Sequence, residues 1–343
     1  MQKKILVVLF LNFQFLFSQQ IGFGVVKEFT TSKDPLKILS GNFSGNKKND
    51  FVVVSKNSIS LYKKNNSNFW VEKKITISNS ILDAAVCNIN GDEFNDIALF
   101  LDDNTVQIVF GNKSDSLFSQ HVFDAQKKNE NIFSVDLTND GKEDLLLYGK
   151  SSLGIRVVEQ LSDKQFYYST TLFREKSYTK IFVTDINKDK LVDIVVYDYM
   201  QNVIQLYLQR GKFRFSSANS WKFFDKVSNF NFVDLNNDEI LDFIVSFENS
   251  KKIKIFYGDE VFDFKESTSL EFQDYILSFY VCDIEKDNFP ELVTLHNNQQ
   301  SMVVFWNSKL ENFKSNTLYS TGFVPSQILF EKLENGFYDA LVL

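Results

Sequence analysis

One spaced set of oxygen-bearing side chains recurs along the 343-residue chain. In the clearest copy, Asp185, Asn187, Asp189 and Asp193 occupy positions one, three, five and nine of a run that lies between apolar residues. Asp, Asn, Thr and Glu supply hard oxygen donors, which suit Ca²⁺ with its six to eight ligands and flexible geometry. Because a tight turn with this spacing can direct several oxygens at one centre, the residues predict cation binding.

Corresponding runs follow one another at a nearly constant interval. They close at positions 50, 96, 144, 193, 242, 291 and 339, which are 46, 48, 49, 49, 49 and 48 residues apart. A regular interval of this length indicates a repeat architecture, in which each unit is too short to bury its own apolar face and stacks on its neighbours. The predicted metal ligands of the second to sixth runs are Asn88, Asn90, Asp92, Asp96, Asp136, Thr138, Asp140, Asp144, Asp185, Asn187, Asp189, Asp193, Asp234, Asn236, Asp238, Asp242, Asp283, Glu285, Asp287 and Glu291.

The number of carboxylates differs between the runs. There is one in the first, two in the second, three in each of the third to fifth, and four in the sixth. Since carboxylate count tunes Ca²⁺ affinity, the third to sixth runs are expected to bind best, and the first and seventh to be empty turns. The alternative is that all the runs are plain turns, because Asp and Asn also bond their own backbone. An EF-hand is excluded, because the flanking helices and the twelfth-position Glu are missing.

The elements that must position these runs are short strands. Within residues 178–226, strand-forming stretches occur at 181–186, 193–197, 203–208 and 213–216, and no window has a helical period. Four antiparallel strands in each repeat describe the blade of a β-propeller, so the predicted fold is all-β. We expect the first strand to be covered on both faces beside the propeller axis and the fourth to lie at the outer rim.

The loop pattern, a hydrophobic residue followed by Asp-x-Asn-x-Asp-(Gly)-x-x-Asp, resembles the FG-GAP or VCBS repeat of the integrin α-subunit propeller and of many secreted bacterial proteins. The resemblance extends from Leu36 to the C-terminus. It implies a seven-bladed propeller with Ca²⁺ between the first and second strands of several blades, held by the residues named above. The family usually has Gly at position six. Here Gly141 and Gly336 keep it, whereas the other runs carry Lys47, Glu93, Lys190, Glu239 and Asn288.

The N-terminus has the composition of an export signal. Lys3 and Lys4 precede an apolar stretch that ends before Ser18, a small residue at a plausible cleavage site. The predicted organisation is a signal peptide at 1–18 and a single propeller domain at 21–343, without a transmembrane span after signal removal. The destination is extracellular, the cell surface or the periplasm. Removing Lys3 and Lys4 leaves 35 basic against 44 acidic residues, a balance that argues against nucleic acid as a partner.

The chain offers little for catalysis. Its two histidines, His121 and His296, fall outside the polar clusters and are read as ordinary strand or loop residues. Cys87 and Cys282 occupy the same slot four repeats apart, too far for a disulfide, and are predicted to be buried free thiols. The predicted function is therefore non-enzymatic: a Ca²⁺-stabilised binding or adhesion module for a protein or glycan. The alternative is a lectin-like or lyase-like part of a polysaccharide-processing system.

Two further expectations concern the last blade and the partner surface. The segment 23–31 is expected to pair with the last blade and close the propeller, which would leave that blade one strand short or the chain truncated. On the rim opposite the acidic loops, exposed aromatic residues would mark the ligand face. The alternative is that they fill the space between adjacent blades. The ligand-face candidates are Tyr197, Tyr199, Trp221 and Phe224, with Met200 and Phe223 beside them.

Overall fold

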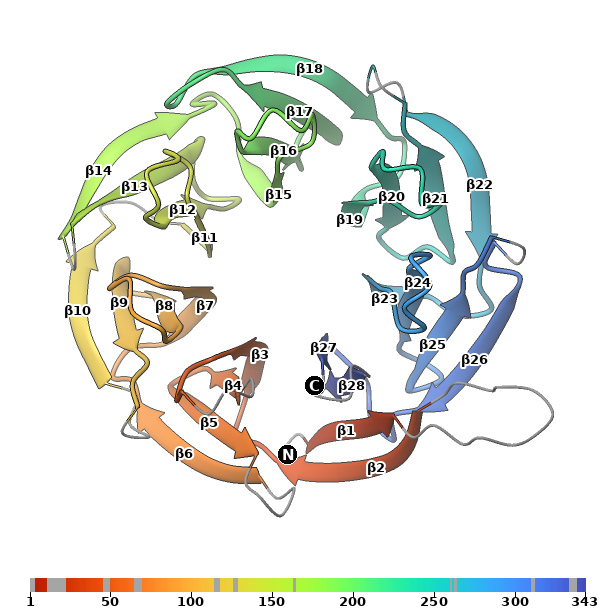
Figure 1. Ribbon diagram of the computed structural model, residues 1–343, viewed down its shortest axis with the longest axis horizontal. Coiled ribbons are helices and arrows are strands. Elements are labelled where there is room, and N and C mark those ends of the chain that lie inside the picture. The colour runs from red at the N-terminus through yellow and green to blue at the C-terminus, as the bar shows by residue number, and fades with distance from the viewer. Residues whose placement is uncertain are drawn as a thin grey trace. The chain divides into compact units, whose positions relative to one another are not determined.

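The computed structural model describes residues 4–10, 23–45, 50–64, 70–113, 118–125, 129–162, 165–259, 261, 264–309, 312–332 and 338–343. Within these residues it contains 28 β-strands and no helix, hence none that could cross a membrane. The strands form four-stranded antiparallel sheets, each of which can be followed in Figure 1. The predicted class, an all-β propeller protein built from four-stranded antiparallel blades, is confirmed.

The chain divides into two compact units, whereas the sequence predicts one domain over 21–343. The first unit contains Thr31–Lys222. Its four sheets each consist of four consecutive strands, because short turns join neighbouring strands. These strands are β3 (Pro35–Gly41), β4 (Asp50–Ser55), β5 (Ser58–Lys64), β6 (Trp70–Thr76), β7 (Ile81–Cys87), β8 (Asp96–Leu101), β9 (Thr105–Phe110), β10 (Phe118–Asp124), β11 (Asn131–Val135), β12 (Asp144–Tyr148), β13 (Ile155–Ser162), β14 (Gln165–Leu172), β15 (Tyr178–Thr184), β16 (Asp193–Asp198), β17 (Val203–Gln209) and β18 (Phe215–Lys222).

The second unit contains Lys4–Thr30 and Phe223–Leu343. Two of its sheets are again made of consecutive strands. They consist of β19 (Val227–Val233), β20 (Asp242–Phe247), β21 (Lys252–Tyr257), β22 (Lys265–Glu271), β23 (Ile276–Cys282), β24 (Glu291–His296), β25 (Ser301–Trp306) and β26 (Ser315–Ser320). The third sheet has the order β2-β1-β28-β27 and joins β1 (Lys4–Phe10), β2 (Phe23–Thr30), β27 (Ile328–Lys332) and β28 (Tyr338–Val342).

This sheet corrects the prediction of a seven-bladed propeller whose last blade is closed by residues 23–31 and is possibly incomplete. Six blades are built from consecutive strands, and the remaining sheet combines both ends of the chain. β2 does not pair with β28 as expected, because β1 lies between them, with Val8 opposite both Val26 and Ala340. The sheet therefore has four strands, not three. β1 comes from the segment predicted as an export signal, and removal of that segment stays a prediction about processing.

Burial identifies the second strand as the core of five blades. All residues of β16 are buried, and the same holds for β4, β8, β20 and β24. The expectation that the first strand is fully covered is wrong, since only Tyr178 is buried in β15. The second strand has hydrogen-bonded neighbours on both edges, whereas the first strand is paired on one edge only. The outer position predicted for the fourth strand is confirmed by the exposed residues of β18 and β26.

Candidate functional site: the acidic loops

Each of the second to sixth acidic runs forms the loop between the first and second strands of a blade, as predicted. In the loop between β15 and β16, the Asp185 carboxylate accepts the backbone N–H groups of Asp189 (3.0 Å) and Lys190 (2.7 Å). The Asn187 side-chain oxygen Oδ1 also accepts the Asp189 N–H at 3.0 Å, and the Asp189 carboxylate accepts the N–H of Leu191 at 2.9 Å. Positions one, three and five thus fold the loop by bonding its own backbone.

The backbone turns left-handed at two positions in most of these loops. Position six, where the FG-GAP or VCBS repeat usually has Gly, is left-handed at Gly141, Lys190, Glu239 and Asn288, which have φ between 67° and 82°. The second loop differs: Glu93 is not among the residues with positive φ, and Gly91, at position four, has φ 67°. A left-handed backbone at position four was not predicted from the sequence, although Gly and Asn, which tolerate this conformation, recur there. The residues with positive φ at position four are Gly45, Gly91, Asn139, Lys188, Asn237 and Lys286.

The closing carboxylate fixes the loop to the rest of its blade. Asp193 is fully buried; one of its oxygens accepts the Ile186 N–H at 2.9 Å and the other accepts the Gln209 N–H of β17 at 2.8 Å. Asp96 and Asp242 make the same two kinds of bond. The ninth position therefore connects the loop, the second strand and the end of the third strand. The sequence did not predict this role.

Burial makes these carboxylates hard to ionise. Desolvation raises the pKa of Asp96, Asp144 and Asp242 to about 6, and it also raises the pKa of Asp193. Desolvation raises the pKa of Glu291 furthest, to about 8, with neighbouring loop carboxylates adding to the shift. Backbone N–H groups act in the opposite direction in each case. A cation beside the loop would stabilise the ionised form and offset this cost.

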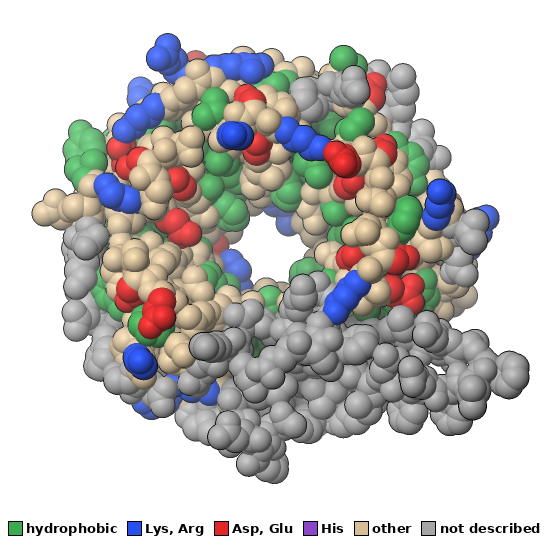
Figure 2. All heavy atoms as spheres, viewed as in Figure 1, with side chains coloured by type: hydrophobic (Ala, Val, Ile, Leu, Met, Phe, Trp, Pro, Cys, Tyr) green, Lys and Arg blue, Asp and Glu red, His purple; other side chains and the backbone are tan. Residues whose placement is uncertain are grey.

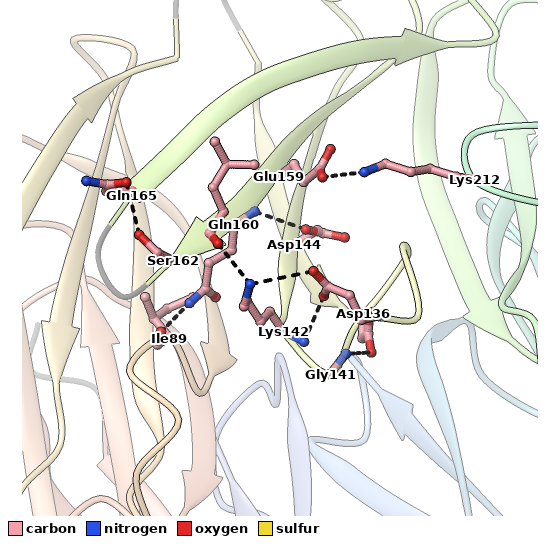
Figure 3. A network of polar contacts seen from close by, with 12 residues as sticks. Ile89, Asp136, Gly141, Lys142, Asp144, Glu159, Gln160, Ser162, Gln165 and Lys212 are labelled. Atoms are coloured by element: carbon pink, nitrogen blue, oxygen red, sulfur yellow. Dashed lines mark hydrogen bonds and ion pairs between the residues drawn. The ribbon is translucent and has the colours of Figure 1, made fainter.

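Figure 3 shows the third loop, where not every oxygen has a partner. Asp136 accepts the N–H groups of Asp140 and Gly141, and one Asp144 oxygen accepts the Gln160 N–H at 3.0 Å. The other Asp144 oxygen, Oδ2, is buried without a hydrogen-bond partner, and so is the Thr138 hydroxyl. An unsatisfied buried oxygen destabilises the fold by about 1–3 kcal/mol. Two predicted ligand positions thus present unpartnered oxygens within one loop.

The same feature occurs in two other loops. The Asn88 side-chain oxygen of the second loop and the Glu291 Oε1 of the sixth are buried and have no hydrogen-bond partner. All four unpartnered oxygens lie at positions one, three or nine, and their chemistry fits a hard cation such as Ca²⁺. No group of three or more His, Cys, Asp or Glu side chains is arranged to hold a metal within the described ranges. The four unpartnered oxygens belong to carboxylate, amide and hydroxyl groups.

The acidic side chains are spread over several blades and do not form one cluster. Figure 2 shows Asp and Glu in separate groups over the blades, not as one continuous acidic patch. In the first loop the Ser44 hydroxyl donates to Asp50 at 2.5 Å, which occupies one oxygen of that loop's single carboxylate. Lys47 of the first loop and Gly336 of the seventh lie outside the described residues. The expectation that the first and seventh loops are empty turns stays a prediction.

Side-chain amides at or just after the end of the third strand of one blade bond the acidic loop of the preceding blade. These bonds were not predicted from the sequence. Gln160 Nε2 donates to the Ile89 carbonyl, and Gln209 Nε2 donates to the Leu137 carbonyl at 2.9 Å. In the second unit Asn307 Nδ2 donates to the Leu235 carbonyl at 2.8 Å. In each case the acceptor is position two of the preceding blade's loop. The sequence does contain a signal for these bonds, because Gln or Asn recurs sixteen positions after the closing carboxylate of each of these three blades.

The predicted ligand-face residues are not all at the surface. Tyr197 is fully buried and its hydroxyl donates to Asn202 at 2.7 Å, so it belongs to the core of its blade. Tyr199 and Trp221 are half-buried, with the Lys150 ammonium 4.6 Å from the centre of the Tyr199 ring. Phe224 is exposed but belongs to the second unit, whereas Tyr199 and Trp221 belong to the first. Tyr199 and Trp221 remain the candidates for partner contact.

The remaining predicted residues are structural. Cys87 and Cys282 are free thiols, as predicted, although only Cys87 is fully buried. His296 is buried at the end of β24, bonded to the Thr294 hydroxyl at 2.8 Å. Burial lowers the pKa of this imidazole, so it is neutral at physiological pH. The His121 side chain lies outside the described residues.

Comparison with known proteins agrees with this architecture. Residues 185–245 and 234–294 match the FG-GAP-like repeat family, and these segments begin at the fourth and fifth acidic loops. No sequence among the curated proteins matches the chain. The class that the sheets and loops define is the β-propeller, and residues 185–294 of the chain carry FG-GAP-like repeats.

Several solved structures share the fold at low sequence identity. A lectin of Agrocybe aegerita that recognises non-reducing terminal N-acetylglucosamine has a TM-score of 0.63, with 13% identity over 92% of this chain and 89% of that chain. The periplasmic gluconolactonase PpgL of Pseudomonas aeruginosa has a TM-score of 0.60 and 12% identity over 96% of this chain and 99% of that chain. BBS1N, in its complex with ARL6DN, has a TM-score of 0.62 and 11% identity over 89% and 91%. At these identities the likeness concerns the fold alone.

Proposed function

We propose that the chain is an exported binding protein whose acidic loops hold Ca²⁺ and thereby stabilise the blades. The observation that carries the calcium part is the set of buried, unpartnered oxygens at Asn88, Thr138, Asp144 and Glu291. Bound Ca²⁺ would give these oxygens a partner and neutralise the buried carboxylates. The second, third and sixth loops are the preferred sites, which modifies the ranking by carboxylate count alone.

The proposed activity is binding of a protein or glycan rather than catalysis. It is supported by the loop chemistry, since the buried carboxylates bond backbone N–H groups and are thus held away from any substrate. Similarity to a lectin and to a chain seen in a protein complex makes both partner classes reasonable. The alternative, an enzyme acting on carbohydrate, is suggested by the gluconolactonase fold.

One set of measurements separates these functions. Thermal unfolding with and without chelator tests calcium, and a glycan array compared with a panel of surface proteins tests the partner class. Assays for lactone hydrolysis and polysaccharide cleavage test the enzyme. Turnover at an enzymatic rate would overturn the binding assignment, and melting curves unaffected by chelation would overturn the calcium assignment.

A further inference from the structure

A second site lies away from the acidic loops, within the first unit. Strands β10, β13 and β14, which can be followed in Figure 1, border a cavity of about 300 Å³. Its lining is mainly aromatic and aliphatic, with a single Arg and a single Asp. A volume of this size lies at the lower end of the range for small-molecule pockets. The residues used below are Phe123, Asp124, Arg156, Phe166, Tyr167 and Tyr168.

Arg156 is the chemically unusual member of this lining. Its side chain is 4% exposed, and its Nε has no hydrogen-bond partner. The guanidinium carbon lies 4.4 Å from the centre of the Tyr168 ring, so a cation–π contact is its compensating interaction. A guanidinium cannot lose its proton at physiological pH. A permanent positive charge with an unused donor therefore lines a cavity, which is the arrangement expected of an anion site.

The geometry of the cation selects the anion. The planar guanidinium fork matches a carboxylate, with which it forms paired, charge-assisted hydrogen bonds. Asp124 is an exposed member of the same lining. A phosphate dianion would bring its second charge near this carboxylate and be repelled, whereas a hydroxyl group could donate a hydrogen bond to it. The combination favours a singly charged ligand that also carries hydroxyl groups.

The aromatic residues indicate the shape of the ligand. Phe123 and Phe166 stack with ring centroids 4.9 Å apart, and Tyr167 is 59% exposed. Aromatic faces carry partial negative charge and attract the polarised C–H face of a sugar ring. We propose that this cavity binds a carboxylate-bearing sugar, such as a terminal uronate of a glycan, with its carboxylate on Arg156 and its ring against the aromatic side chains. This assignment rests on the binding function proposed above and specifies its ligand class.

The test uses the full chain and titration calorimetry with methyl β-glucuronide as the probe. Methyl β-glucoside, which lacks the carboxylate, is the matched ligand, and benzoate and inorganic phosphate are the other anions. We expect binding of the glucuronide and at least about tenfold weaker binding of the three others, because only the glucuronide offers both a carboxylate and hydroxyl groups. Equal binding of glucoside and glucuronide, equal binding of benzoate or phosphate, or absence of glucuronide binding would overturn the proposal.

Substitutions of residues that line the cavity test whether the glucuronide binds there. Arg156→Met should weaken glucuronide binding at least about tenfold while leaving the melting temperature of the unliganded protein equal or higher, since it removes an unpaired buried charge. Phe166→Leu, which removes one of the two stacked rings, should also weaken binding, and its melting curve checks the fold. Arg210→Met, which removes an exposed Arg just after β17, is the control and should bind normally. Unchanged affinity in both Arg156→Met and Phe166→Leu would reject the site. The response to chelator should persist in all variants, so failure here is distinguishable from failure of the calcium proposal.

Discussion

The fourth and sixth acidic loops share one spacing but differ at their closing residue. In the fourth, both oxygens of Asp193 accept backbone N–H groups. In the sixth, Glu291 accepts the Ile284 N–H at 2.6 Å through one oxygen, and the other oxygen is buried without a partner. One additional methylene group displaces the carboxylate from the second bond. Loops with equivalent sequences therefore differ in hydrogen bonding. In some loops both oxygens of the closing carboxylate are hydrogen-bonded, and in others one oxygen has no partner.

The strongest test of this comparison is removal of divalent cations. If unpartnered oxygens mark the ion sites, chelation should lower the melting temperature substantially, since each occupied site at about a hundred times its Kd contributes about 2.7 kcal/mol. Ca²⁺ should restore stability more than Mg²⁺, whose small octahedral shell suits such loops poorly. Calorimetric melting with chelator, then with each cation, measures this. Identical curves would leave every acidic loop a plain turn.

The next largest effect concerns pH in the presence of chelator. The folded state raises the pKa of Glu291 from 4.5 to about 8, so the folded state binds the proton more tightly than the unfolded state. The stability from this group is fully present below pH 4.5 and is lost as pH rises through 8. The change is on the order of 5 kcal/mol at about 1.36 kcal/mol per pKa unit.

Urea unfolding of the parent and Glu291→Gln proteins between pH 5 and pH 9 isolates this contribution. The amide cannot ionise, so the stability of the parent relative to the variant should fall across this interval. Asp193→Asn is the matched control in the fourth loop, where two hydrogen-bonded oxygens oppose the desolvation. A parallel pH dependence in the parent and in Glu291→Gln would contradict the burial argument.

Exchanging the closing residues should show that side-chain length makes the difference. Asp193→Glu inserts a methylene group into a fully buried position and disturbs its backbone bonds, which should cost about 1–3 kcal/mol. Glu291→Asp brings the carboxylate closer to its own strand and should change stability by less than about 1.5 kcal/mol. Denaturant unfolding in chelator measures both. A larger loss from Glu291→Asp than from Asp193→Glu would reverse the interpretation.

The smallest expected effect separates turn formation from ion binding. Asp189→Ala and Asp287→Ala each remove a carboxylate that accepts a backbone N–H two residues later, at a cost of about 1 kcal/mol in chelator. With Ca²⁺ present, Asp287→Ala should lose more, because the sixth loop is a preferred site. Asn46→Ala, whose position lies outside the described residues, should have little effect. Equal losses with Ca²⁺ and with chelator would restrict both carboxylates to a turn role.

The sequence was sufficient for the repeat, the strand class and the positions of the acidic loops. For the fourth blade it placed strands at 181–186, 193–197, 203–208 and 213–216, because apolar runs and turn residues bound each one. The structure has the first three within about three residues at each end, whereas the fourth extends to Lys222. At the last blade it did not predict that Lys4–Phe10 pairs with β28. The assignment of residues 1–18 to an export signal stays a prediction. An apolar run of this length has the composition of both a signal core and a buried strand, and local sequence cannot separate them.

What the sequence determined by itself is the chemistry of the repeat: which oxygens recur, at which spacing, between which apolar runs. These are local properties, fixed by residue type and by the short reach of a turn. Tertiary structure decided how each oxygen is used. Asp193 meets the Gln209 N–H sixteen residues away, Glu291 leaves one oxygen unpartnered, and Arg156 is brought beside Tyr168. Such outcomes depend on which strands pack together, because burial removes water and makes each missing partner costly.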